Sequence, residues 1–163
     1  MEIILAENHG FCYGVKRAVE MANEAADSDG KSYTLGPIIH NPQVVGRLES
    51  KGVSPIREVS DIDEGTMIIR SHGVGPAIYE EAEEKGLNIL DATCPHVKKA
   101  QQDAKSVIED GMTLVILGEK NHPEVKSINL WANNKGIIIE DEESAQKLQI
   151  VEKMGVVVQT TFS

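Results

Sequence analysis

Cysteine, aromatic residues and positive charge are all scarce in this chain of 163 residues. It has two cysteines and one tryptophan, and Phe, Trp and Tyr together make up 4% of the sequence. So few aromatic side chains provide no ladder on which nucleic-acid bases could stack. Lys and Arg number 16 against 26 Asp and Glu, so the formal net charge is -10, which disfavours contact with a phosphate backbone. We therefore expect no nucleic-acid partner.

Long apolar runs, targeting signals and nucleotide-binding loops are also missing. No stretch approaches the roughly 18 apolar residues of a membrane-spanning helix. The first ten residues, MEIILAENHG, lack the basic start and small-residue cleavage site of a secretory signal. No Gly-x-Gly-x-x-Gly follows a predicted strand, and no Walker-type loop is present. We therefore expect a cytoplasmic protein with no membrane partner and no nucleotide triphosphate site.

The two cysteines, Cys12 and Cys94, are expected in a reducing compartment, where a structural disulfide between them is disfavoured. Reactive thiols, metal ligands and inert buried thiols remain as interpretations. Two thiolates alone underfill the usual metal sites, because zinc takes about four ligands and an iron-sulfur cluster takes three or four cysteines. A metal at these cysteines would therefore need further ligands.

Short β-branched apolar runs alternate with helical patterns along the chain. The runs predict strands at residues 3–6, 33–35, 66–69, 88–90, 113–117, 136–139 and 155–158. The patterns between them predict helices at residues 15–26, 44–50, 77–85, 97–109, 124–132 and 142–148. This alternation is typical of open parallel sheets with helices on their faces, so we expect an α/β fold.

The segment GFCYGVKRA at residues 10–18 returns in altered form as ATCPHVKKA at residues 92–100. Cys94 follows Cys12 by 82 residues, and the same offset relates His122 to His40. Recurrence at one offset, each time at a predicted strand-to-helix junction, indicates a duplicated βα unit. We therefore expect two α/β domains, residues 1–83 and 84–163, related by a pseudo-rotation axis toward which both cysteines point.

Three histidines share one context. His40, His72 and His122 each follow a predicted strand and precede a helix with a proline near its first turn. In open α/β sheets these strand ends line the crevice where ligands bind, and helix N-termini attract anions. A single histidine in such a place is more often a helix cap or a packed core residue. Three in equivalent places favour a pocket for a diphosphate.

The last residues, GVVVQTTFS, predict a strand and the beginning of a loop without a helix to cover the sheet. We therefore expect that a third repeat, with a third cysteine, is missing from this sequence. Two other interpretations stay open at this point. One is a non-catalytic module that binds diphosphate or another anion without metal, and the other is a zinc or thiol-redox site completed by dimerisation across the cysteines.

An ordered set of motifs carries a family resemblance that covers the whole chain. The motifs are GFCYGVKRA, IIHNPQVV, RSHGV, DATCP, NHPEV and QTTFS. The set resembles the 4-hydroxy-3-methylbut-2-enyl diphosphate reductases, LytB-type iron-sulfur enzymes of the non-mevalonate isoprenoid pathway. Members of that family are longer, with three similar α/β domains and a third cluster cysteine in the part that is absent here.

The resemblance implies a reductive dehydroxylation that yields isopentenyl and dimethylallyl diphosphate. Cys12 and Cys94 would be ligands to a 4Fe-4S cluster with one open iron that can bind substrate oxygen. The diphosphate would lie on His40, His72 and His122. Electrons would come from a protein donor, a ferredoxin or a flavodoxin.

The resemblance also gives roles to Glu124 and Thr160. Glu124 would be the proton source, although a Glu in a first helical turn is usually explained by the helix dipole. Thr160 would hold the hydroxyl end of the substrate, although it also reads as the end of a β-branched strand. Lys16, Arg17, Lys98 and Lys99 could temper the charge of a cluster, but solvated helix faces explain them as well.

Overall fold

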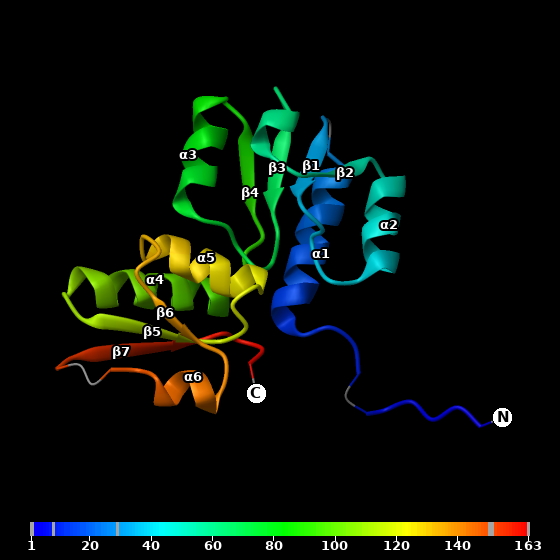
Figure 1. The fold of residues 1–163 in the computed structure, drawn as a ribbon. Helices are drawn as coiled ribbons and strands as arrows, with labels where there is room; N and C mark the ends of the chain where they lie inside the picture. Colours follow the sequence, from blue (N-terminus) through cyan, green and yellow to red (C-terminus); the bar gives the residue numbers. More distant parts are fainter. Residues whose placement is uncertain (1, 8, 29, 150–151, 163) are drawn as a thin grey trace.

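The computed structural model describes residues 2–7, 9–28, 30–149 and 152–162. These residues form two parallel sheets, each with its own covering helices, and the two α/β units meet at the centre of the molecule (Figure 1). This confirms the repeated open parallel-sheet architecture. Within the described residues, no helix combines the length and the apolar character needed to cross a membrane.

The first sheet is parallel throughout, with the strand order β2-β1-β3-β4. Its strands are β1 (Ser32–Leu35), β2 (Val53–Ile56), β3 (Thr66–Ile69) and β4 (Asn88–Asp91). The helices of this unit are α1 (Tyr13–Ala26), α2 (Pro42–Ser50), α3 (Pro76–Glu84) and the short 3-10 helix η1 (Val59–Asp61). Alternate residues of β3 face opposite layers: Ile68 packs in a cluster with α1 and α2, whereas Met67 and Ile69 pack with α3 and η1.

The second sheet has the order β6-β5-β7 and is also parallel. Its strands are β5 (Thr113–Leu117), β6 (Ile137–Ile139) and β7 (Met154–Val158). The helices of this unit are α4 (Pro95–Glu109), α5 (Pro123–Trp131) and α6 (Glu142–Gln146). Leu114, Ile116 and Val157 pack in one buried cluster with α4 and α5, so these two helices cover one face of the sheet.

The duplicated plan is visible in the sheet orders. In each unit the first strand is central, the next strand lies on one side of it, and the third lies on the other side. The expected boundary between residues 83 and 84 falls ahead of β4, which pairs with β3 in the register of Asn88 with Thr66. The first sheet therefore extends to Asp91, and the change from one sheet to the other takes place along α4.

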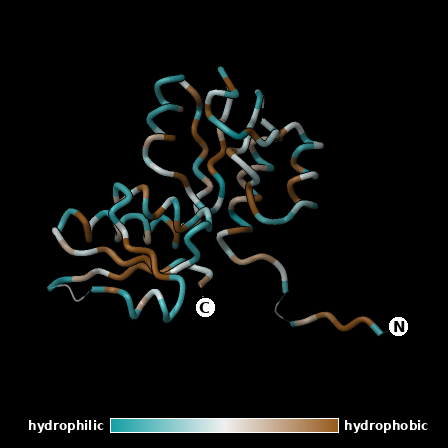
Figure 2. Tube along the Cα trace, viewed as in Figure 1, coloured by the Kyte–Doolittle hydropathy of each residue, from teal (hydrophilic) through white to brown (hydrophobic). Residues whose placement is uncertain are grey.

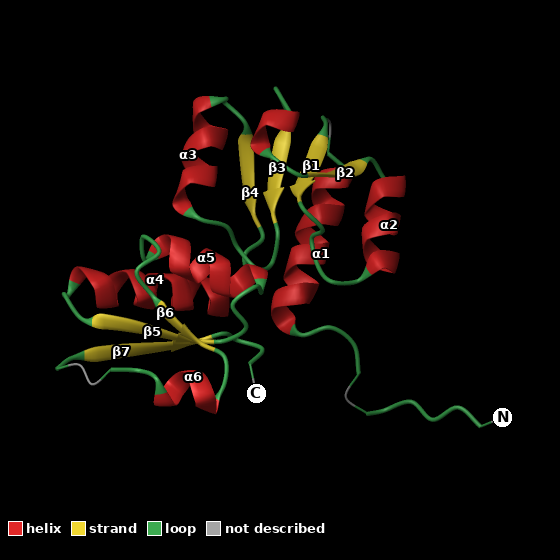
Figure 3. Cartoon of the chain, in the orientation of Figure 1, coloured by secondary structure: helices red, strands yellow, loops and turns green. Residues whose placement is uncertain are grey.

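Two elements differ from the sequence-based expectation. Residues 3–6 are not a strand: Ile3, Ile4 and Leu5 are 75%, 82% and 76% exposed, and the apolar N-terminal segment runs as a loop away from both sheets (Figures 2 and 3). The apolar run suited a strand, but a strand also needs a neighbour to hydrogen-bond with, and no described strand lies beside it. Strand β2 was not predicted, because Pro55 interrupts its apolar pattern. Proline is tolerated there because β2 is an edge strand.

Candidate functional site

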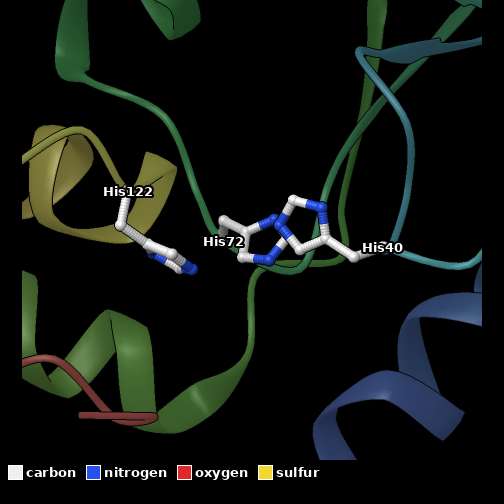
Figure 4. Close-up of side chains that lie close together, drawn as sticks. All are labelled: His40, His72 and His122. Carbon is white, nitrogen blue, oxygen red and sulfur yellow. The ribbon is translucent and has the colours of Figure 1, made fainter. Parts of the chain in front are cut away.

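Three histidines from separate strand ends meet where the two units join (Figure 4). His40 follows β1, His72 follows β3, and His122 follows β5. The ring centroids lie 4.5 Å apart for His40 and His72, 5.5 Å for His72 and His122, and 6.1 Å for His40 and His122. One ring nitrogen from each histidine lies within 4.8 Å of the other two. The structure therefore brings together the histidines that the sequence singled out.

A proline occupies the first helical position after two of these loops. Pro42 follows the cap of α2, Asn41, whose side chain accepts a hydrogen bond from the Val44 amide. Pro123 follows the cap of α5, which is His122 itself. Proline suits this position, because its fixed φ is helical and its missing N–H would have no helical partner. Two helix N-termini, each with positive partial charge, therefore begin beside the histidine cluster.

His122 has its ring orientation defined by a local hydrogen bond. Its Nδ1 accepts from the Glu124 amide at 3.2 Å. In the neutral ring the proton is then on Nε2. This nitrogen is free to donate to a ligand. His122 therefore acts both as a helix cap and as a potential donor in the pocket.

His72 is the most perturbed histidine of the cluster. Burial, together with the nearby His40, Arg70 and His122, lowers the pKa of His72 to about 4. Its Nδ1 is buried and has no hydrogen-bond partner within the described residues. His72 is therefore neutral near pH 7, with ring hydrogen-bonding capacity that the described chain does not satisfy.

The histidines line one side of a pocket of about 360 Å³. Phe11, Val15 and Ile39 supply apolar walls, and the other lining residues are Asn41, Ser71 and Thr161. Three imidazoles at this spacing can either ligate a divalent metal or donate N–H groups to an anion. Positive potential from two helix N-termini and from Arg70 opposes a metal cation, so the surroundings favour an anion.

Glu124 and Thr160 form a second part of the site. Glu124 is 1% exposed, and its carboxylate accepts hydrogen bonds from the Thr160 main-chain nitrogen at 2.6 Å and from the Thr160 hydroxyl at 2.9 Å. Thr160 itself is exposed. The pair joins the first turn of α5 to the segment after β7, and the exposed hydroxyl connects the buried carboxylate to the surface.

The two cysteines are the N-terminal caps of α1 and α4. Both thiols are free; Cys12 is exposed and Cys94 is half-buried. Neither helix start donates a hydrogen bond to its cap side chain. A Cβ placed on Gly14 would lie 2.5 Å from the Cys94 sulfur, so the first turn of α1 packs directly on that thiol. Glycine at this position is what allows the two helix starts to approach each other.

A polar network missed by the sequence analysis holds the His72 loop. The Ser127 hydroxyl, on α5, donates to the His72 carbonyl oxygen at 2.9 Å, and Gln101 on α4 donates to that hydroxyl at 3.2 Å. The indole nitrogen of Trp131 donates to the Val74 carbonyl oxygen at 2.9 Å. No sequence signal marks these residues, because polar and aromatic residues on helices are usually explained by solvent or packing.

Arg17 is also placed differently from a solvated helix face. Its guanidinium donates to the carbonyl oxygens of Thr93 at 3.2 Å and Asp91 at 3.3 Å. These carbonyl groups belong to the last residue of β4 and to the residue just before Cys94. Arg17 therefore ties α1 to the loop that carries the second cysteine.

These features define a class: an α/β protein with a histidine-lined pocket and two free thiols where the strand ends of two parallel sheets meet. The model of the LytB protein family matches residues 3–163. The chain belongs to the LytB family.

Curated relatives agree with the family match. The chain is 52% identical over 163 residues to a protein of Geotalea uraniireducens and 51% identical to one of Geobacter metallireducens, both named 4-hydroxy-3-methylbut-2-enyl diphosphate reductase. Each match covers 100% of this chain and 58% of the relative. The chain thus spans little more than half the length of these relatives.

Solved structures show the same fold. One is described as the structure of (E)-4-hydroxy-3-methyl-but-2-enyl diphosphate reductase, the terminal enzyme of the non-mevalonate pathway; it has a TM-score of 0.84 and 47% identity, with 98% of this chain and 58% of that chain covered. Another is described as the structure of the E-1-hydroxy-2-methyl-but-2-enyl-4-diphosphate reductase from Plasmodium falciparum, with a TM-score of 0.90 and 33% identity. That match covers 95% of this chain and 50% of the other.

Proposed function

We propose that this chain supplies part of a 4-hydroxy-3-methylbut-2-enyl diphosphate reductase. The reaction is the reductive dehydroxylation of this allylic diphosphate to isopentenyl and dimethylallyl diphosphate. The observation that carries the proposal is the meeting of His40, His72 and His122, from three strand ends, around one pocket. The names of the relatives support the same substrate class.

The histidine cluster would bind the diphosphate end of the substrate. His122 offers its Nε2–H, because its Nδ1 accepts from the Glu124 amide. His72 is neutral when the pocket is free, and a diphosphate beside it would favour the protonated ring. The positive ends of α2 and α5 would add to the attraction. The cluster therefore offers both hydrogen-bond donors and a charge that adjusts to the ligand.

Glu124 and Thr160 would serve the hydroxyl end of the substrate. Glu124 is buried and so is shielded from bulk water, and Thr160 is exposed and hydrogen-bonded to it. A proton held at Glu124 could pass through the Thr160 hydroxyl to the leaving oxygen of the substrate. The pair would therefore act as general acid and relay.

The two cysteines fit an iron-sulfur group. Both are free thiols at helix N-termini, and the Cys94 sulfur lies against the first turn of the helix that Cys12 caps. Cys12 and Cys94 would be two ligands of a 4Fe-4S cluster, with a third cysteine from elsewhere in the longer protein. When bound, the cluster would supply the electrons for breaking the allylic carbon–oxygen bond. A ferredoxin or flavodoxin would provide them in the cytoplasm.

Substrate binding tests the role of the histidines. By calorimetry, His122→Asn should weaken binding of 4-hydroxy-3-methylbut-2-enyl diphosphate to this chain by about tenfold or more, the size of one lost charge-assisted hydrogen bond. His96→Asn is the matched control, because His96 is exposed in the first turn of α4. Equal affinities of the two variants would remove the histidine cluster from the substrate site.

Iron binding tests the cysteines. Purified in air, the chain should be colourless and mostly free of iron, because a cluster with only two thiolates from this chain would be exposed to oxidation. After anaerobic reconstitution with iron and sulfide, Cys12→Ser and Cys94→Ser should each lower the bound iron. A brown protein that keeps a full cluster in air, or iron uptake that ignores both substitutions, would contradict this assignment.

A further inference from the structure

A second pocket lies beside the loops that carry His72 and His122. It has a volume of about 390 Å³ and is lined by residues that flank the histidines without including them. Asn121 and Pro123 flank His122, and Gly73 follows His72. The pocket lies between the carboxyl ends of the first sheet's strands and helix α5, which is where open α/β sheets bind ligands.

The charge of this pocket is unusual for so acidic a chain. Arg57, Arg70 and Lys126 line it, and no Asp or Glu does. The whole sequence carries a formal net charge of -10. The side chains come from the end of β2, the end of β3 and helix α5. Three positive side chains therefore converge, from both units of the fold, on a space without negative charge. We call this space the basic pocket.

The guanidinium of Arg70 has no anionic partner among the described residues. Burial lowers the pKa of its guanidinium. Its Nε is buried and has no hydrogen-bond partner in the described part of the chain, and the guanidinium forms no ion pair there. Arg70 is half-buried, and a charge held partly out of water without a partner is costly. An anion in the basic pocket would remove this cost.

The exposed cations of the pocket are available as well. Neither Arg57 nor Lys126 forms an ion pair with the described residues. The carboxylate of Asp61 lies near Arg57, but it accepts hydrogen bonds from the main-chain nitrogens of Arg57 and Glu58 at 2.9 and 3.0 Å. The guanidinium of Arg57 and the ammonium of Lys126 can therefore pair with a ligand.

The basic pocket also has an apolar lining. Leu35, Val74, Ile78 and Leu130 line it, and Leu130 is 43% exposed. A ligand that pairs an oxyanion with a short apolar body would cover both kinds of surface. The pocket is also large enough for more than an inorganic ion.

We infer that the basic pocket is a second ligand site, which binds a small organic phosphate with its phosphoryl oxygens on Arg57, Arg70 and Lys126. The apolar body of the ligand lies against Leu130 and Ile78. The inference goes beyond the proposed reductase function, since none of the residues assigned to the substrate or to the cluster lines this pocket.

The test is a titration of the 163-residue chain with butyl phosphate, followed by proton–nitrogen NMR. The amides of Ile78 and Leu130 report on the basic pocket, and the amide of Asn41 reports on the histidine pocket. Arg57→Gln with Lys126→Gln should weaken butyl phosphate binding at the first reporters by about tenfold or more, as expected for two lost charge-assisted contacts. Inorganic phosphate should bind more weakly than butyl phosphate.

The control is Arg47→Gln with Lys120→Gln, which makes the same charge change on exposed residues that do not line the basic pocket. It should change the affinity by less than about twofold. All four substituted side chains are exposed, so both double variants should fold. If the Arg57→Gln and Lys126→Gln pair does not fold, Lys126→Gln alone replaces it. Equal losses in both pairs, no shift at Ile78 and Leu130, or equal affinity for the two phosphates would overturn the inference. Shifts at Asn41 alone would support only the histidine pocket.

Discussion

The buried carboxylate of Glu124 accepts both hydrogen bonds that Thr160 can donate, one from its main-chain nitrogen and one from its hydroxyl. The two residues are 36 positions apart, one at the start of α5 and the other just after β7. A glutamate that only complemented a helix dipole would not need this partner, because solvent could hydrate it. The contact therefore assigns Glu124 a structural link, on which its proposed chemical role would build.

Replacing Glu124 by glutamine separates these two roles. In a reductase of full family length that carries this sequence, Glu124→Gln should cost about 1 kcal/mol of stability, because the amide keeps the shape and part of the hydrogen bonding. Turnover should fall by about two to four orders of magnitude, as for a lost general acid. Anaerobic turnover with an artificial electron donor and thermal melting measure the two effects. Glu119→Gln, on the exposed preceding loop, is the control, and near-normal turnover of Glu124→Gln would exclude the acid role.

The low pKa of His72 predicts a pH dependence of stability. The folded pKa of about 4 lies below the ordinary 6.5, so the unfolded chain binds the additional proton between these values. The contribution to stability is complete above about pH 6.5 and is lost as the pH falls toward 4. Because the ring is partly exposed, we expect a loss of about 1 to 2 kcal/mol between pH 7 and pH 4.5.

Urea unfolding at these two pH values, on the native chain and on His72→Gln, isolates this contribution. Carboxyl groups with lowered pKa values, such as that of Asp91, also affect acid stability, but both proteins share them. The variant should lose less stability on acidification than the native chain. Identical losses would show that the His72 ring is not buried in its neutral form.

Replacing Gly14 with a larger residue should disturb the packing at Cys94. Gly14→Ala places a methyl group 2.5 Å from the Cys94 sulfur, so the start of α1 or of α4 must shift. We expect a loss of about 1 to 3 kcal/mol, as for other overpacked positions, and weaker iron binding. Gly46→Ala is the matched control within a helix, because nothing lies within 4 Å of its added methyl group. It should stabilise the chain by about 0.5 to 1 kcal/mol. Denaturant unfolding measures the change in the free energy of unfolding for both variants. Stabilisation by Gly14→Ala would contradict the close approach of α1 to Cys94.

Removing the Ser127 hydroxyl should weaken the anchoring of the loop that carries His72. Ser127→Ala removes the donor to the His72 carbonyl oxygen and the acceptor for Gln101, both in a buried position. The free energy of unfolding should fall by about 1 to 3 kcal/mol. Diphosphate binding should weaken too, because the His72 loop loses an anchor. Ser50→Ala, whose exposed hydroxyl bonds only within its own helix, is the control. Unchanged diphosphate affinity in Ser127→Ala would limit Ser127 to a stabilising role.

Most strands and helices could be predicted from local patterns, because they depend on the period of apolar residues and on Gly and Pro at the ends. In the exceptions, the presence or absence of a neighbouring strand determined whether a strand formed. Residues 3–6 have the composition of a strand but no described neighbour, whereas β2 contains Pro55 and still pairs along β1 as an edge strand. Pairing is a tertiary property, so local pattern alone could not resolve either segment.

In the candidate site, too, some features could be predicted from the sequence and others depend on the tertiary structure. The sequence by itself determined which residues stand at the strand ends, since the 82-residue offset and the prolines place cysteines and histidines at the starts of helices. Only the tertiary structure decided which of them meet. The contact of Glu124 with Thr160 joins residues 36 positions apart, and Gly14 packs on Cys94 from 80 positions away. The Arg70 guanidinium is left without a partner by the same folding. Such contacts depend on how helices, strand ends and the two units pack in three dimensions, and no pattern along the chain records that geometry.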